Sequence, residues 1–375
     1  SEYSALVQVM LSSSEKNNIA DRQVRQRYNS LRPRIAHILS CWAVTSLSAR
    51  GRIPFEPNFF DLVVIDEASQ CDIASALPLL YRAKSAVIIG DPKQLKHISS
   101  IAQKQDFLLL TKHNMSDGYA SWLYSVQSLF DLASSLCERQ DIILLRDHHR
   151  SHKDIIGFSN EFFYEGRLRV ATNYNKLKPM PRNEPIVRWC DVKGKVERPF
   201  GQGALNLLEA RSVVREIERL VLEQEYQGSI GVVSPFRAQA NKIRELVEQN
   251  KVLARRLDDI EFLADTVHRF QGDERDLMIF SPVVSVGLDD KQRWFLQNNF
   301  NLFNVAITRA RSALVVVGDQ SAASNSGIDY LEKFAEYIDK LGDTNVSDIE
   351  EHVDHGPEYP KVSAQATVSD WEKVF

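Results

Sequence analysis

Cysteine is rare in this sequence of 375 residues. Only Cys41, Cys71, Cys137 and Cys190 occur, and no two of them form a Cys-x-x-Cys pair. A disulfide framework or a structural zinc site needs clustered cysteines, so this spacing argues against both. We expect four buried free thiols.

Long apolar runs are absent as well. No run of roughly 18 apolar residues occurs, the length at which a transmembrane helix is suspected. The first residues also lack the basic segment, apolar core and small-residue cleavage site of a secretory signal. These absences predict a protein without a membrane partner that works in the cytoplasm, or in the nucleus of a eukaryote.

Glycine and proline are sparse, with 16 and 13 residues, while 43% of the chain is hydrophobic and 26% charged. This composition excludes collagen-like and disordered chains and is typical of globular proteins. The net charge of −4 gives no sign of a polyanionic partner. Residues 342–375 hold eight carboxylates and two lysines, a local charge of −6, so residues 1–341 carry a net charge of +2. A nucleic-acid groove is therefore permitted.

Short apolar runs rich in valine and isoleucine indicate buried parallel strands. They cover residues 60–66, 85–91, 142–145, 186–190, 229–234, 277–282 and 313–319. Periodic segments predict helices at 19–28, 203–226 and 237–250. The alternation predicts an α/β fold with doubly wound parallel sheets.

The chain is longer than the roughly 100–200 residues usual for one domain. We expect a first domain over residues 1–140 and a second over 141–325. A C-terminal helix and an acidic, partly disordered tail follow over 326–375. The tail is a candidate site for a protein partner.

The segment FFDLVVIDEASQ, residues 59–70, is an apolar strand that ends in two carboxylates. Open α/β sheets bind ligands at the carboxyl ends of their strands. At this edge Asp66 is a candidate ligand of Mg²⁺, and Glu67 is a candidate base for the water that attacks a γ-phosphate. The competing interpretation is a strand that runs into an acidic loop or helix cap.

The segment SAVIIGDPKQL, residues 85–95, has a similar ending. Gly90 permits a tight turn, Asp91 adds a carboxylate, and the amide of Gln94 could sense the γ-phosphate. The competing interpretation of this segment alone is a Gly-Asp-Pro turn. Together the two segments resemble motifs II and III of superfamily 1 helicases, particularly the Upf-like group of P-loop enzymes.

The later segments resemble the remaining motifs of that family in order. They are residues 144–168, 232–239, 266–276 and 304–319. The resemblance implies tandem RecA-like domains, the first incomplete at its N-terminus, with ATP and Mg²⁺ as cofactors. It implies catalytic roles for Glu67, Gln94, Arg150 and Arg309. It implies nucleotide binding by Asp66, Gln70, Asp91, Gln271, Gly272 and Glu274. It implies nucleic-acid contacts by Arg237, Gln239 and His268. The competing interpretations are that Arg150 makes a surface contact and that Arg309 and Arg311 lie on a solvated helix face.

A phosphate-binding G-x-x-x-x-G-K-[ST] loop is missing. The one Gly-Lys pair, Gly194-Lys195, is followed by Val196, and Trp189 stands where the first glycine is needed. We expect either a truncated chain or a loop on another chain, and a poor ATPase in isolation. Two functions stay open: an ATP-dependent helicase or translocase on single-stranded DNA or RNA, and a non-catalytic module that binds nucleic acid or protein.

Overall fold

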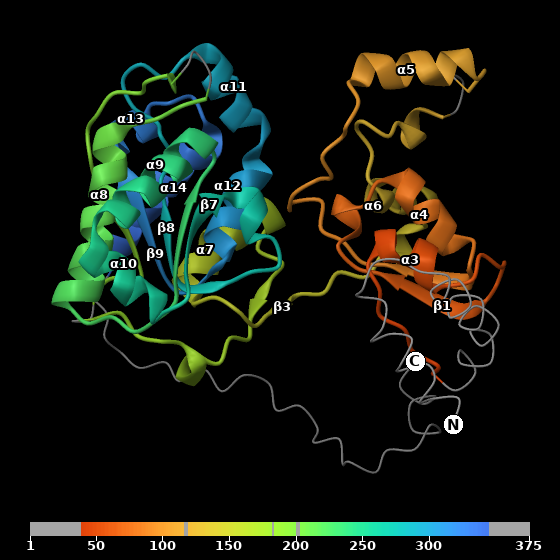
Figure 1. Ribbon diagram of the computed structural model, residues 1–375, viewed down its shortest axis with the longest axis horizontal. Helices are drawn as coiled ribbons and strands as arrows, with labels where there is room; N and C mark the ends of the chain where they lie inside the picture. The colour runs from red at the N-terminus through yellow and green to blue at the C-terminus, as the bar shows by residue number, and fades with distance from the viewer. Residues whose placement is uncertain (1–38, 116–118, 182–183, 200–202, 345–375) are drawn as a thin grey trace, which may run out of the picture. The chain divides into compact units, whose positions relative to one another are not determined.

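The computed structural model describes residues 39–115, 119–181, 184–199 and 203–344. The chain divides into two compact units after Leu144, four residues beyond the boundary expected at 140. Each unit is described by itself (Figure 1). The helix expected at 19–28 and the acidic tail beyond residue 344 lie outside the described residues.

The described part of the first unit is built on two parallel strands, β1 (Phe60–Ile65) and β2 (Ala83–Ile88). Its helices are α3 (Ser46–Arg52), α4 (Ile73–Leu80), α5 (Gln103–Lys112) and α6 (Leu129–Leu136). Residues of β1, α4 and α6 form a small core on one face of the sheet. On the other face Leu62, Val64 and Val87 are exposed.

The second unit holds a parallel sheet of five strands in the order β5-β9-β8-β6-β7. They are β5 (Val187–Asp191), β6 (Ile230–Ser234), β7 (Phe262–Thr266), β8 (Arg275–Phe280) and β9 (Ala310–Gly318). A separate parallel pair is formed by β3 (Asp147–His148) and β4 (Arg169–Val170). The five-stranded sheet confirms the α/β fold with a RecA-like, doubly wound parallel sheet.

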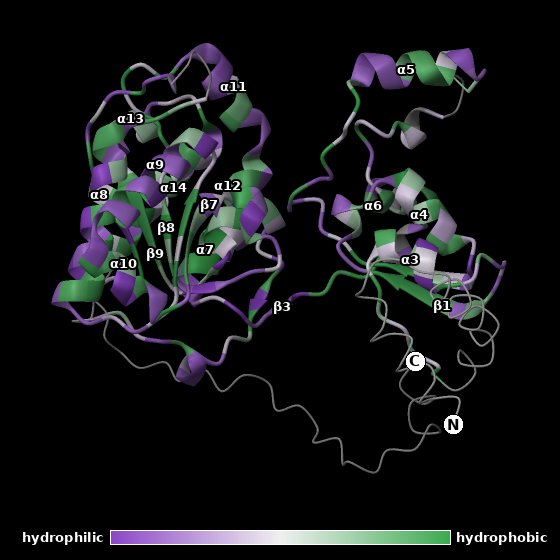
Figure 2. Cartoon of the chain, viewed as in Figure 1, coloured by the Kyte–Doolittle hydropathy of each residue, from purple (hydrophilic) through white to green (hydrophobic). Residues whose placement is uncertain are grey.

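Helices cover both faces of this sheet. On one face lie α8 (Leu207–Glu218), α9 (Arg237–Gln249) and α10 (Lys251–Asp258), whose aliphatic side chains form the main core. On the other lie α7 (Lys153–Tyr164), α12 (Phe300–Thr308) and α14 (Asp329–Thr344), joined by the edge-on rings of Phe158, Phe303 and Phe334. The remaining helices are α11 (Asp290–Asn298) and α13 (Gln320–Ser324). Figure 2 shows the apolar strands enclosed by helices with hydrophilic outer faces.

Six of the seven expected strands are present within a few residues of their predicted bounds. The strand predicted at 142–145 is wrong. Those residues are irregular, and Ile143 and Leu145 are exposed, because the segment connects the two units and has no neighbouring strand to pair with. Strand β7 was missed, since Asp265 and Thr266 interrupt its apolar pattern.

The expectation of four buried thiols is also wrong. Cys41 and Cys137 are exposed, and Cys71 and Cys190 are half-buried. Burial raises the pKa of the Cys71 and Cys190 thiols above the usual range, which keeps them protonated.

Among the described residues, no helix is both long and apolar enough to cross a membrane.

Candidate functional site

The predicted site residues of the first unit lie at one edge of its sheet. The parallel register pairs Ile65 with Ile88, so both strands end at the same edge. The backbone N–H of Ala68 then donates to the carbonyl of Ile89 at 2.8 Å. The segments after β1 and β2 are thereby held side by side, as the sequence predicted.

Gly90 permits this close approach. A Cβ at this position would lie 2.7 Å from Cδ2 of Phe130 and 3.0 Å from the backbone nitrogen of Ser69. The chain leaving β2 therefore passes directly against the 3-10 turn Ala68–Gln70. A larger residue would push the two segments apart.

Asp66 and Glu67 are exposed at this edge. Glu67 has a left-handed backbone with φ of 53°, and its N–H donates to Oδ1 of Asp66 at 2.8 Å. Nε2 of Gln70 donates to Oε2 of Glu67 at 2.8 Å. Left-handed backbone is unfavourable for a residue with a side chain and is concentrated at functional sites. The turn thus presents two adjacent carboxylates to solvent.

Asp91 organises the second segment. Its Oδ1 accepts from the N–H of Lys93 at 2.8 Å, and its Oδ2 accepts from Nε2 of Gln94 at 3.2 Å. Both Asp91 and Gln94 are half-buried. The carboxylate fixes the amide of Gln94 beside the edge that carries Asp66 and Glu67.

The donor set at this edge fits a magnesium ion that arrives with a nucleotide. Within the described residues, no group of three or more histidine, cysteine or acidic side chains could hold a metal by itself. Mg²⁺ is usually held by one or two carboxylates together with phosphate oxygens and water. Asp66 is an exposed carboxylate at this edge and has the chemistry of such a ligand.

A second set of predicted residues gathers at the amino ends of β8 and β9. Nε of Arg150 lies 2.7 Å from Oε2 of Glu274, and Nη1 of Arg150 donates to the carbonyl of Thr308 at 3.4 Å. The other oxygen of Glu274, Oε1, lies 3.5 Å from Nη1 of Arg311. One glutamate therefore holds two arginines that come from different elements.

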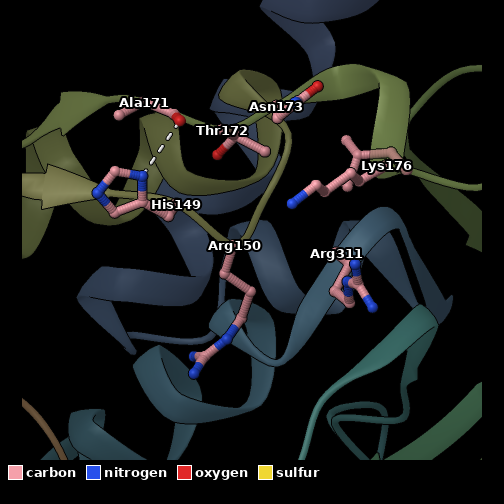
Figure 3. A pocket seen from close by; sticks show the side chains of 8 residues that line it. His149, Arg150, Ala171, Thr172, Asn173, Lys176 and Arg311 are labelled. Atoms are coloured by element: carbon pink, nitrogen blue, oxygen red, sulfur yellow. Dashed lines mark hydrogen bonds between the residues drawn. The ribbon is translucent and has the colours of Figure 1, made fainter. Parts of the chain in front are cut away.

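A pocket of about 150 Å³ opens beside these arginines (Figure 3). Lys176 extends toward the space between Arg150 and Arg311 in this view. The pocket is lined by His149, Arg150, Ala171, Thr172, Asn173, Lys176, Leu177 and Arg311. Three cationic side chains in one small pocket suit an anion such as a phosphate.

Arg309, the predicted arginine finger, does not line this pocket. Its side chain is only 3% exposed, whereas Arg311 is partly exposed and reaches Glu274. In this structure Arg311, and not Arg309, lines the pocket. The competing interpretation placed both Arg309 and Arg311 on a solvated helix face, because the spacing of the two arginines does not show which one is enclosed.

Gln271 and Gly272 form the turn that leads to Glu274. Gly272 has φ of 71°, in the left-handed region, and a Cβ there would meet nothing within 4 Å. The glycine is needed for its backbone conformation and not for space. Gln271 is half-buried beside it.

Arg237 and His268 lie at the opposite edge of the sheet, after β6 and β7. Both are exposed. Partial burial and the nearby charge of Arg237 lower the pKa of His268, so it is neutral near pH 7. Arg237 opens the 13-residue helix α9, whose N-cap Phe236 provides no side-chain hydrogen bond. An N-terminus of this kind attracts phosphate groups.

The nucleic-acid role predicted for Gln239 is contradicted by its burial. Gln239 is fully enclosed, its Oε1 accepts from the N–H of Asn206 at 2.9 Å, and its Nε2 donates to Oγ of Ser281 at 3.0 Å. The residue links α8, α9 and the end of β8. A buried side chain with these partners cannot contact a ligand.

Glu209 belongs to the same buried network and was missed from the sequence. It is fully buried, and its Oε1 accepts from Oγ of Ser281 at 2.5 Å and from the N–H of Val283 at 2.9 Å. Burial raises the pKa of Glu209 to about 8. Val283 has a left-handed backbone with φ of 58°, which is costly for a β-branched residue. Glu209 holds that strained turn.

A family model described as an AAA domain matches residues 125–321, and a second model with the same description matches residues 8–98. Several curated relatives are helicases by name. Helicase sen1 of Schizosaccharomyces pombe is 30% identical over 270 residues, which is 69% of this chain and 14% of the relative. The chain belongs to the superfamily 1 helicases.

Other relatives of this helicase chain carry similar names. An uncharacterized ATP-dependent helicase, MG140, of Mycoplasma genitalium is 30% identical over 297 residues, covering 76% of this chain and 25% of the relative. A solved structure of the PRRSV helicase is 16% identical, with a TM-score of 0.30, and covers 68% of this chain and 34% of that chain. The chain thus spans about a seventh to a quarter of the length of these two curated relatives.

Proposed function

We propose that this chain is the motor part of an ATP-dependent helicase or translocase that moves on single-stranded DNA or RNA. The observation that carries the proposal is the grouping of the motif residues at three sheet edges. Asp66, Glu67 and Gln94 share one edge, Arg150 and Arg311 share another, and Arg237 lies at a third. The resemblance to the Upf-like group supports 5′ to 3′ polarity.

The first edge would act on the nucleotide. Asp66 would bind the Mg²⁺ that accompanies ATP, and that ion would neutralise phosphate charge. Glu67 would accept a proton from the attacking water, since its carboxylate is exposed and fixed by Gln70. Gln94, held by Asp91, would hydrogen-bond the γ-phosphate or that water.

The arginine pocket would stabilise the transferred phosphoryl group. Arg150 and Arg311 are oriented by Glu274 before any ligand binds, so little reorganisation is needed when charge develops. Glu274 is half-exposed and could also accept a hydrogen bond from the ribose. Gln271 and Gly272 would shape the turn that lets the backbone approach the nucleotide.

The edge with Arg237 and His268 would bind the strand. Phosphates would lie against the first turn of α9, and binding would weaken steeply with added salt because counterions are released. Neither DNA nor RNA is favoured by these contacts, since phosphate binding and stacking serve both. The proposed place of action is the cytoplasm, or the nucleus of a eukaryote.

The test is ATP turnover by the full-length protein with and without a single-stranded oligonucleotide. We expect turnover to rise with the strand and to be lost in Glu67→Gln, and we expect displacement of a labelled complementary strand. The proposal would be contradicted if ATP turnover did not change when DNA or RNA was added and no strand was displaced.

A non-catalytic binding module is the second candidate. In such a module the arginine pocket and the exposed Arg237 would bind phosphate groups without turnover, and no G-x-x-x-x-G-K-[ST] loop would be needed. Residues 1–375 alone should bind ATP weakly. A version extended upstream to include such a loop should bind in the micromolar range. Equally tight ATP binding by both versions would show that the phosphate site is complete without the loop.

A further inference from the structure

Trp294 is the large aromatic side chain that the outer face of α11 presents to solvent, with 67% of its surface exposed. Single exposed apolar residues are common and need no function by themselves. The surroundings of Trp294 are what distinguish it. Lys291 lies one turn earlier on the same exposed stripe of the helix.

Helix α11 is firmly anchored. Asp289 and Gln292 form a reciprocal capping box at its start, and Leu296 is buried beneath it. The hydroxyl of Tyr330 donates to the carbonyl of Leu296 at 3.1 Å, and Nη1 of Arg293 donates to the carbonyl of Ser326 at 2.9 Å. The indole of Trp294 is therefore displayed from a rigid helix and not from a loop.

Two contacts tie α11 to the first turn of α9. The rings of Phe295 and Phe236 lie 5.8 Å apart between centroids, and Phe236 is the N-cap of α9. Nε2 of Gln292 donates to the carbonyl of Gly203, and a Cβ on Gly203 would lie 3.7 Å from Cβ of Ala238, the second residue of α9. Trp294 is thus carried by a helix that packs beside the exposed Arg237.

The charges around this region suit a polyanion with aromatic bases. Arg237 and Lys291 are exposed cations, and the N-terminus of α9 adds a partial positive charge. The carboxylate of Asp289, the N-cap of α11, lies 2.9 Å from Nη2 of Arg198, which offsets its charge. Asp290 is the remaining acid of the first turn.

We propose that Trp294 is a stacking platform for an unpaired base of the single strand whose phosphates lie at the start of α9. The inference rests on the proposed function and adds a residue that contacts bases. Stacking of a base on an aromatic side chain is independent of base identity, which suits a motor that moves along any sequence. Removing it should weaken binding by about 5- to 100-fold.

The experiment measures the Kd of a labelled single-stranded oligonucleotide, as DNA and as RNA, for the full chain by fluorescence anisotropy. Wild type is compared with Trp294→Ala, Trp294→Phe and the control Val252→Ala, which truncates a side chain that is 64% exposed on α10. A matched oligonucleotide with abasic sites separates bases from backbone. Trp294→Ala should weaken binding by about 10-fold, Trp294→Phe by much less, and Val252→Ala not at all.

The difference between wild type and Trp294→Ala should disappear on the abasic strand. An equal Kd for wild type and Trp294→Ala on the normal strand would overturn the stacking role, as would an equal loss on both strands. Failure of the proposed function has a different signature. In that case wild type shows no salt-sensitive binding of either strand, and Arg237→Ala changes nothing.

Discussion

Arg150 and Glu274 are 124 residues apart in the sequence, yet Nε of Arg150 lies 2.7 Å from Oε2 of Glu274. The same carboxylate contacts Arg311, so its two oxygens orient two guanidinium groups. A guanidinium held in this way loses less freedom when it meets a phosphate. In the proposed function, this pair would orient the arginine pocket before a nucleotide binds.

Replacing Arg150 should affect turnover and spare strand binding. In the full-length protein, Arg150→Ala should lower ATP turnover on the order of 10²-fold, because transition-state charge loses a donor. Arg150→Lys should recover only part of the lost ATP turnover, since a point charge cannot reproduce the planar fork of the guanidinium group. Steady-state ATPase assays and nucleotide-free oligonucleotide binding measure both effects.

Arg256→Ala is the matched control, because Arg256 is an exposed arginine on α10 with a long 3.7 Å contact to Asp259. It should change neither measurement. If Arg150→Ala abolished strand binding and left turnover unchanged, Arg150 would belong to the nucleic-acid surface.

Glu67→Gln should separate ATP binding from hydrolysis. The amide keeps the size of the side chain and its contact with Gln70 but cannot accept a proton. Turnover should fall by at least roughly 10²-fold while ATP affinity is retained. Asp66→Asn should instead weaken binding of ATP in the presence of Mg²⁺. Near wild-type turnover in Glu67→Gln would remove Glu67 from the role of base.

Glu209 should make the stability of the second unit depend on pH. Its pKa is raised from 4.5 to about 8, mainly by burial, with Asp319 nearby, so the folded state binds more protons than the unfolded state between these values. This contribution to the free energy of unfolding is complete below about pH 4.5 and is lost as pH rises through 8. Denaturant unfolding of wild type at several pH values measures how the free energy of unfolding changes with pH.

Glu209→Gln should flatten that pH dependence. The amide oxygen can still accept from Ser281 and Val283, so the strained turn keeps its support without a titrating group. A variant with the same pH dependence as wild type would show that other groups cause it.

Gly90→Ala should destabilise the first unit by about 1–3 kcal/mol, because the added methyl group meets Phe130 and the backbone of Ser69. Gly51→Ala is the control. Gly51 lies within α3, and a Cβ there meets nothing within 4 Å, so alanine should stabilise the helix by about 0.5–1 kcal/mol. Thermal unfolding measures the Tm of each variant relative to wild type. Equal shifts in Tm for Gly90→Ala and Gly51→Ala would contradict the packing argument.

The apolar strand pattern predicted the sheet of the second unit well, since buried parallel strands need continuous valine and isoleucine runs. It failed at residues 142–145 and at β7. The first is an apolar run without a strand partner, and the second is a strand whose polar Asp265 pairs with Arg244 at 3.1 Å. Pairing partners lie far away in sequence, so a local pattern does not contain them.

The sequence by itself determined the family, the strand endings and the identity of the acids at the first sheet edge, because those depend on motifs of neighbouring residues. Tertiary structure decided which motif side chains reach solvent. Gln239 and Arg309 are enclosed while Arg311 faces the pocket. It also placed Glu209 against Val283, 74 residues away. Burial is set by packing between distant segments, and spacing along the chain cannot report it.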